Sequence, residues 1–103
     1  MADIKRALMF LGLCRRSGSL KSGEENTEAC VKSGKAKLVL LSEDASANTA
    51  KKFTDKCRSY HTELRVFPAD KQTIGHALGQ TDRSCLAITD EGMASTLLKI
   101  LNS

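Results

Sequence analysis

The sequence predicts an α/β fold in which helices cover both faces of a mostly parallel sheet, a three-layer α/β/α sandwich. Segments with apolar residues at helical spacing alternate with short apolar runs along the whole chain. The runs at 38–41 (LVLL) and 85–88 (CLAI) are apolar at every position, which is typical of strands covered on both faces. Because alternating helices and strands usually form crossover units, this order favours a central sheet between two helical layers.

The first predicted helix covers residues 2–16. Its apolar residues recur every three or four positions, as on one side of a helix: Ile4, Ala7, Leu8 and Leu11. Met9, Phe10 and Leu13 widen this stripe, so we expect the helix to pack on two sides. Arg15 and Arg16 fall in the last turn, where they either complement the helix dipole or contact a nucleic acid. Residues 17–19 (SGS) then turn the chain.

Residues 20–41 combine a capped helix with a buried strand. A short extra strand is expected near Leu20. Ser22 fits a helix N-cap, and Glu25 lies three residues later, as a capping box requires. Gly34 follows the helix at a position where the left-handed conformation favours glycine. Lys35 and Lys37 then flank the start of the strand at 38–41.

The middle of the chain predicts a helix and an outer strand. Asp44 or Ser46 can cap a helix that runs to about residue 60. Its apolar face carries Ala50, Phe53, Cys57 and Tyr60. Residues 63–67 (ELRVF) alternate between polar and apolar, which indicates a strand with one wetter face, nearer an edge of the sheet. Pro68 closes this strand.

Two further helices flank the last strand. Asp70 can cap a short helix that carries Ile74 and Leu78 and ends at Gly79. A polar loop at 80–84 (QTDRS) precedes the strand at 85–88. Asp90 can cap a final helix, whose apolar residues are Met93, Leu97, Leu98 and Leu101.

Length and charge narrow the function classes. A chain of 103 residues is expected to form one domain with its own core. We see no signal peptide and no apolar run long enough to span a membrane, so we expect a cytoplasmic protein. The first 42 residues hold eight basic and four acidic residues, and the rest holds eight of each. This local surplus fits either a polyanionic partner or an ordinary solvated basic face.

The sequence offers no catalytic or metal-binding motif. It lacks a Gly-x-Ser-x-Gly elbow, a Gly-x-Gly fingerprint and a P-loop. His61 and His76 lie in polar contexts and are expected at the surface. The four cysteines are 16, 27 and 28 positions apart, so we expect buried, reduced thiols and no zinc site. We therefore expect no enzyme, no cofactor and no metal.

Stretches along nearly the whole chain resemble the ribosomal protein L7Ae/L30e superfamily, which recognises kink-turn RNA, and within it the small bacterial YlxQ-like branch. The stretches that carry the resemblance are GL at 12–13, RSG at 16–18, SGEE at 22–25, SGKAKLVLL at 33–41, EDAS at 43–46, NT at 48–49, TDKC at 54–57, Gly75 with Gly79, and AITDEG at 87–92. The resemblance implies one L7Ae-like RNA-binding domain over residues 1–103. It also implies a three-layer α/β/α sandwich around a four-stranded mixed sheet.

The resemblance further implies that RNA is held by the N-terminus of the second helix, the segment before it, and the loop before the last strand. Helix N-termini offer free amides to phosphates, and basic residues neutralise a sharply bent RNA. By position, Gly23 matches the family's close-approach glycine. Glu25 stands where kink-turn binders usually have Asn or Lys, and Asn26 stands where they usually have Glu or Gln. Ala29 stands where a lysine is usual, which removes about one phosphate contact.

These considerations give a candidate RNA-binding set: Arg16, Lys21, Gly23, Glu24, Glu25, Asn26, Lys35, Lys37 and Arg83. The expected partner is kink-turn or ribosomal RNA, with the ribosome itself as a further candidate. We expect no membrane partner, no DNA and a monomer. A protein-interaction module on the same fold is the alternative, because Glu24, Glu25 and Glu28 on one helix favour a basic protein surface over RNA.

Overall fold

The computed structural model describes residues 3–102 and contains five helices and four strands in that range. The helices are α1 (Ile4–Arg16), α2 (Glu24–Lys32), α3 (Ala47–Ser59), α4 (Lys71–Ala77) and α5 (Glu91–Asn102). The strands are β1 (Leu20–Ser22), β2 (Leu38–Ser42), β3 (Glu63–Phe67) and β4 (Cys85–Ile88). The predicted alternation is confirmed, including the short extra strand after the first helix.

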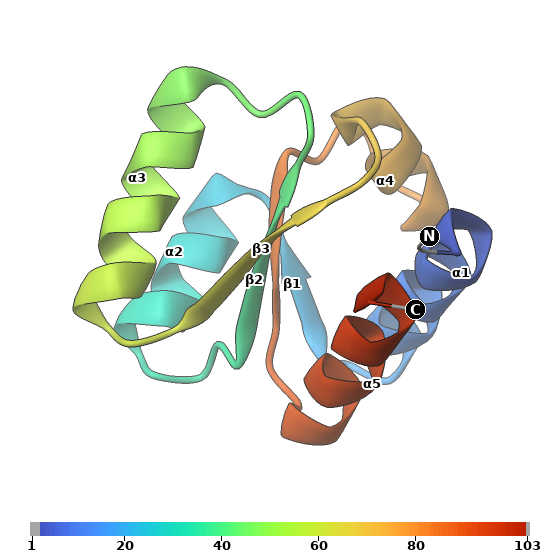
Figure 1. Cartoon of the computed structure of the whole chain (residues 1–103), viewed down its shortest axis with the longest axis horizontal. Coiled ribbons are helices and arrows are strands. Elements are labelled where there is room, and N and C mark those ends of the chain that lie inside the picture. The colour runs from blue at the N-terminus through green and yellow to red at the C-terminus, as the bar shows by residue number, and fades with distance from the viewer. Residues whose placement is uncertain (1–2, 103) are drawn as a thin grey trace.

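The helices lie in two layers on opposite faces of the sheet (Figure 1). Alternate residues of the two inner strands point to opposite layers. Leu38, Leu40, Leu86 and Ile88 share a core with α1, α4 and α5, and Val39, Leu41, Cys85 and Ala87 share a core with α2 and α3. This alternation explains why β2 and β4 are apolar at every position: each strand is covered on both faces. The three-layer α/β/α sandwich is therefore confirmed.

The sheet is mixed, with strand order β1-β4-β2-β3. Only β2 and β3 pair in parallel, whereas β4 is antiparallel to both of its neighbours. The expectation of a mostly parallel sheet is wrong, and the four-stranded mixed sheet implied by the resemblance is confirmed. The reason is the short connection through α4. Phe67 at the end of β3 is level with Ser42, and Ser84 accepts a hydrogen bond from the Ser42 amide, so β4 starts at the end of the sheet where β3 finishes.

Side-chain caps start four of the helices. Asp3 Oδ1 accepts from the Arg6 amide, so α1 begins at Ile4; Ala2, included in the predicted helix, lies outside the described residues. Ser46 caps α3 through the Thr49 amide. Asp44, the other candidate, accepts instead from the Lys71 amide and ties the β2–α3 loop to α4. Asp70 and Asp90 cap α4 and α5 as predicted.

Helix α1 buries one side only, so the expected packing on two sides is wrong. Ala7, Leu11 and Cys14 are fully buried, but 69% of Met9 and 44% of Leu13 is exposed. The helix belongs to an outer layer, and its main contacts are with α4, α5 and β1. Tyr60 at the end of α3 is likewise exposed rather than part of that helix's buried face.

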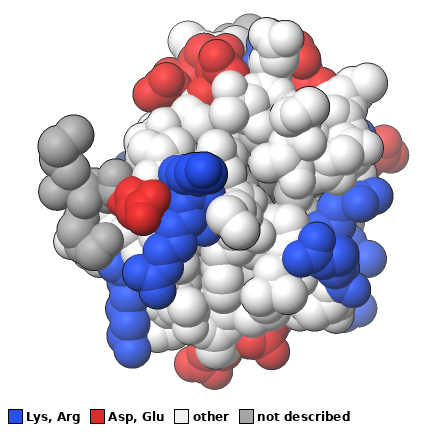
Figure 2. Space-filling model, turned by 90° about the vertical axis from the view of Figure 1, so that its right-hand side faces the viewer, with Lys and Arg blue, Asp and Glu red and all other residues white. Residues whose placement is uncertain are grey.

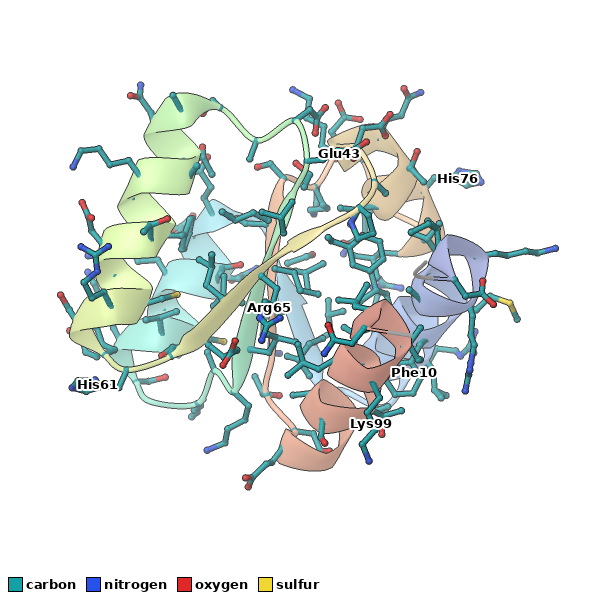
Figure 3. The ribbon with its side chains drawn as sticks, viewed as in Figure 1. Phe10, Glu43, His61, Arg65, His76 and Lys99 are labelled. Atoms are coloured by element: carbon teal, nitrogen blue, oxygen red, sulfur yellow. The ribbon has the colours of Figure 1, made fainter. Side chains whose placement is uncertain are left out.

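The cysteines and histidines lie where the sequence places them. All four cysteines are free and buried, and burial raises the pKa of Cys14 and Cys57 to about 11. These thiols therefore stay protonated at neutral pH and behave as small apolar side chains. His61 and His76 are exposed and point away from the core (Figure 3). None of the described helices is long and apolar enough to cross a membrane.

Candidate nucleic-acid interface

The turn between β1 and α2 presents an open helix N-terminus. Gly23 occupies the N-cap position with φ 91° and ψ 156° and makes no side-chain capping bond. The Gly23 amide donates a hydrogen bond to the Cys85 carbonyl at 3.0 Å, and the Gly23 carbonyl accepts one from the Thr27 amide at 2.9 Å. Among the described residues, the amides of Glu24, Glu25 and Asn26 make no hydrogen bond. Three donors at the positive end of a helix dipole are thus available to an anion.

Ser22 does not cap α2, so the predicted capping box is wrong. Ser22 is the last residue of β1, opposite Leu86 in the sheet, and this position buries its side chain away from the helix. Its hydroxyl donates to Gln80 Oε1 at 2.6 Å and accepts from Arg83 Nε at 3.2 Å. Asn26 Nδ2 instead reaches back to the Ser22 carbonyl at 3.1 Å, and Glu25 is exposed.

The contacts of Ser22 with Gln80 and Arg83, here called the latch, join two segments about 60 residues apart in sequence. Arg83 Nη1 also donates to Thr81 Oγ1 and to the Asp82 carbonyl, each at 2.9 Å. The Nη1 group of Arg83 therefore holds the 80–84 loop in its own conformation. The latch places this loop beside the β1–α2 turn, so the two segments implied in RNA binding do lie together.

The 80–84 loop also packs closely on α4. A Cβ atom added to Gly75 would lie 2.0 Å from the Thr81 carbonyl oxygen, so only glycine allows this approach. Between α4 and the loop lies a polar hollow of about 510 Å³. The residues that line it are Gln72, Thr73, His76, Gln80 and Asp82. No local pattern in the sequence marks this hollow, because the residues that line it belong to two segments that only the tertiary structure joins.

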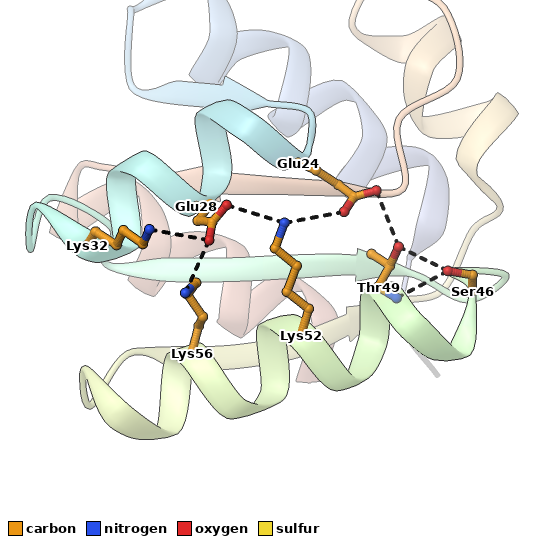
Figure 4. A network of polar contacts seen from close by, with 7 residues as sticks. All are labelled: Glu24, Glu28, Lys32, Ser46, Thr49, Lys52 and Lys56. Carbon is orange, nitrogen blue, oxygen red and sulfur yellow. Dashed lines mark hydrogen bonds and ion pairs between the residues drawn. The ribbon is translucent and has the colours of Figure 1, made fainter.

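Two of the three α2 glutamates face α3 and are neutralised there (Figure 4). Lys52 Nζ lies 3.2 Å from Glu28 and 3.8 Å from Glu24, Lys56 lies 3.1 Å from Glu28, and Lys32 adds a contact with Glu28 at 3.5 Å. Glu24 also accepts from the Thr49 hydroxyl. Only Glu25 of the three makes no ion pair among the described residues. The i, i+4 spacing of Glu24 with Glu28, and of Lys52 with Lys56, puts each pair on one side of its helix. The packing of α2 on α3 then brings the two sides together.

Glu28 should make stability depend on pH in the acid range. The hydrogen bonds from Lys56 and then Lys52 lower the pKa of Glu28 to about 2, from an ordinary value of about 4.3. A depressed carboxylate pKa contributes stability that is complete above the unfolded-state pKa and lost as pH falls towards the folded-state value. We expect Glu28→Gln to lower the Tm at neutral pH and the difference from wild type to vanish between about pH 4.3 and about pH 2. Thermal unfolding across that range measures it.

Glu43→Gln is the matched control, since Glu43 is exposed and forms no ion pair among the described residues. If the Tm difference from wild type also appeared at neutral pH in Glu43→Gln and vanished over the same pH range, Glu28 would have no special role.

The other predicted residues lie towards the opposite end of the sheet. The Lys37 amide bonds to the Ile88 carbonyl, at the far end of β4 from the contact between Gly23 and Cys85. Lys35 and Lys37 are exposed just beyond the C-terminus of α2. Arg16 ends α1 next to the segment in which Ser19 accepts from Thr89. Lys21 is exposed in β1, between the two ends.

The structure thus divides the predicted set into two groups. Gly23, Glu24, Glu25, Asn26 and Arg83 lie at the β1–α2 turn, and we call them the turn group. Arg16, Lys35 and Lys37 lie towards the other end of β4 and form the distal group, with Lys21 between the groups.

The sequence and the mixed-sheet sandwich both match a known family of proteins. The chain belongs to the ribosomal protein L7Ae/L30e/S12e/Gadd45 family, whose model matches residues 6–98. It is 40% identical over 93 residues to the RNA-binding protein YlxQ of Bacillus subtilis, covering 90% of this chain and 92% of that protein. It is 30% identical over 98 residues to the large ribosomal subunit protein eL30 of Methanoregula boonei, covering 93% and 90% of the two chains.

Two solved structures have the same fold. A protein of unknown function from Bacillus halodurans superposes with a TM-score of 0.87 at 35% identity and covers 94% of this chain and 97% of its own. The 15.5kD RNA binding protein of Giardia lamblia superposes with a TM-score of 0.80 at 16% identity, covering 99% and 88%. The family and the fold implied by the resemblance are confirmed.

Proposed function

We propose that this protein is a non-catalytic RNA-binding protein that holds structured RNA, of the kink-turn or ribosomal type, at the turn group. The observation that carries the proposal is the set of three free amides at the N-terminus of α2, which the latch places beside the 80–84 loop. The amides bind a phosphate, and Gly23 lets the RNA backbone approach the main chain. The Asn26 amide group can turn from the Ser22 carbonyl to the edge of an unpaired or sheared base. RNA-binding relatives support the RNA-binding part of this proposal.

The charge at this end of α2 supports RNA over a basic protein partner. Three glutamates in one helix favour a basic protein partner only if their carboxylates are not already paired with lysines. Glu24 and Glu28 are paired with lysines of α2 and α3, which leaves Glu25 as the one carboxylate here without an ion pair among the described residues. That carboxylate is exposed and can turn towards solvent.

A mobility-shift titration with a kink-turn duplex and a straight duplex of the same length tests the proposal. We expect tighter binding to the kinked RNA and a steep loss of affinity between about 50 and 200 mM salt. Equally weak binding to both duplexes would rule out recognition of the kink. Tight binding to both would leave RNA binding in place and remove only the specificity. Weak salt dependence would point instead to a protein interface with an apolar core.

The distal group decides how far the RNA extends along the sheet. Lys37 is exposed, so we expect Lys37→Glu to weaken RNA binding while the fold is kept. If Lys37 holds one phosphate, the slope of log affinity against log salt falls by about 0.7–0.9. Salt titrations of the wild type and the variant measure this change.

Lys99→Glu on α5 is the control, because it changes the net charge equally at an exposed site outside the candidate set. An equal loss in both variants would show a general charge effect. An unfolded Lys37→Glu variant would give Lys37 a structural role.

A further inference from the structure

Helix α1 carries an exposed stripe that no other part of the described structure covers. Arg6, Met9, Leu13 and Arg16 recur at helical spacing on the side of α1 away from its buried Ala7 and Leu11. Beside the stripe, α1 and α5 form a shallow groove of about 340 Å³. Its main lining residues are Arg6, Met9, Phe10, Leu13, Arg16 and Ile100. On this face of the molecule a broad uncharged area separates groups of Lys and Arg side chains (Figure 2).

The chemistry of the groove is apolar in the middle and basic at both ends. Met9 is 69% exposed, and methionine is a common side chain at surfaces that accept apolar partners. The side chains of Arg6 and Arg16 form no ion pair among the described residues, and no acidic residue lines the groove. The two arginines are ten residues apart, or about 15 Å along the helix axis.

We propose that the groove between α1 and α5 binds an acidic amphipathic helix of a partner protein. Apolar side chains one turn apart on that helix cover Met9 and Leu13. Two carboxylates about 15 Å apart on it, near its two ends, meet Arg6 and Arg16. This site lies on the layer of α1 and α5, across the sheet from α2. A partner can therefore occupy it while RNA is held at the turn group, but not while RNA contacts Arg16 of the distal group.

The charge pattern disfavours the two other occupants. A second copy of this chain would bring arginines of one α1 against arginines of the other in either helix orientation, and like charges repel. A nucleic acid carries a phosphate at each nucleotide, whereas this groove offers two cations separated by an apolar surface. The only aromatic side chain of the groove, Phe10, is half-buried against the core rather than open for base stacking.

Fluorescence anisotropy with a designed peptide tests the proposal on the full chain. The probe is a labelled helical peptide of about 18 residues, with leucines along one side and two glutamates ten positions apart on either side of the leucines. The control peptide has lysines in place of these glutamates. We expect saturable binding of the acidic peptide and much weaker binding of the basic one. Met9→Glu should weaken the acidic peptide about tenfold or more, and Arg6→Glu should weaken it while improving binding of the basic peptide.

Thr54→Glu, at an exposed position of α3, is the control variant and should bind the acidic peptide as wild type does. Thermal unfolding confirms that each variant is folded. If Met9→Glu does not fold, Arg6→Glu alone tests the groove. No saturable binding below about 1 mM, or equal binding of the two peptides, would overturn the proposal. A dimer that Met9→Glu dissociates would assign the groove to a second copy. Loss of RNA binding in Met9→Glu would assign it to RNA. Either result would also overturn the proposal.

Discussion

Gly75→Ala is expected to destabilise the protein by about 1–3 kcal/mol or more and to weaken RNA binding. The added Cβ would lie 2.0 Å from the Thr81 carbonyl oxygen and 2.7 Å from its carbonyl carbon. Both are main-chain atoms, so the 80–84 loop has to move as a whole. That movement pulls Gln80 and Arg83 away from Ser22 and breaks the latch. Urea unfolding and a mobility shift with the kink-turn duplex measure the two effects.

Gly12→Ala is the matched control, since Gly12 is also inside a helix but has room for a methyl group. Its added Cβ would lie 3.5 Å from the Ala77 carbonyl oxygen, an ordinary contact. Alanine is the better helix former by about 0.5–1 kcal/mol, so this variant should be as stable as the wild type or more so. Equal stability of the two variants would contradict the close packing at Gly75. Unchanged RNA binding in a destabilised Gly75→Ala would separate the loop from the RNA site.

Gly23→Ala is expected to reduce RNA affinity about tenfold, which corresponds to about 1.4 kcal/mol of binding free energy. The backbone at Gly23, with φ 91° and ψ 156°, lies in a region that is almost restricted to glycine and costs other residues about 1–3 kcal/mol. The turn relaxes to relieve this strain, and the amides of Glu24, Glu25 and Asn26 lose their common direction. Filter binding with the kink-turn duplex measures the loss.

Gly18→Ala separates the loss of RNA contacts from the loss of stability. Gly18 also has a positive φ, 77°, and nothing lies within 4 Å of an added Cβ, so backbone strain is the main effect there too. We expect a comparable loss of stability in the two variants and near-normal RNA binding in Gly18→Ala alone. If both variants bind RNA like the wild type, the N-terminus of α2 is not the RNA site.

The sequence by itself determined most of the secondary structure and the family, because those signals are local. Ser46, Asp70 and Asp90 cap helices through amides three residues away. Residues 38–41 and 85–88 are apolar at every position because both strands are covered on both faces. The alternation at 63–67 correctly predicted the edge strand β3.

The main errors concern contacts between distant segments. Ser22 has the local pattern of a capping box, but its strand position turns the hydroxyl towards Gln80, 58 residues away. Met9 and Leu13 have the local pattern of a helix packed on two sides, yet α1 has no outer neighbour in the described structure. The antiparallel direction of β4 depends on the end of the sheet at which the chain emerges after the short helix α4. No local pattern in the sequence records that position.

The candidate site divides in the same way. Gly23 in the turn before α2 is visible in the sequence. The free amides of Glu24, Glu25 and Asn26 are not, because the sequence predicts a capping box from Ser22. The tertiary structure alone decided that Arg83 joins Gly23 through Ser22, and that Lys35 and Lys37 lie at the far end of β4. The same packing of α2 on α3 set lysines against Glu24 and Glu28. Local patterns depend on neighbours within one helical turn, whereas the shape and charge of a binding surface depend on which distant segments the sheet brings together.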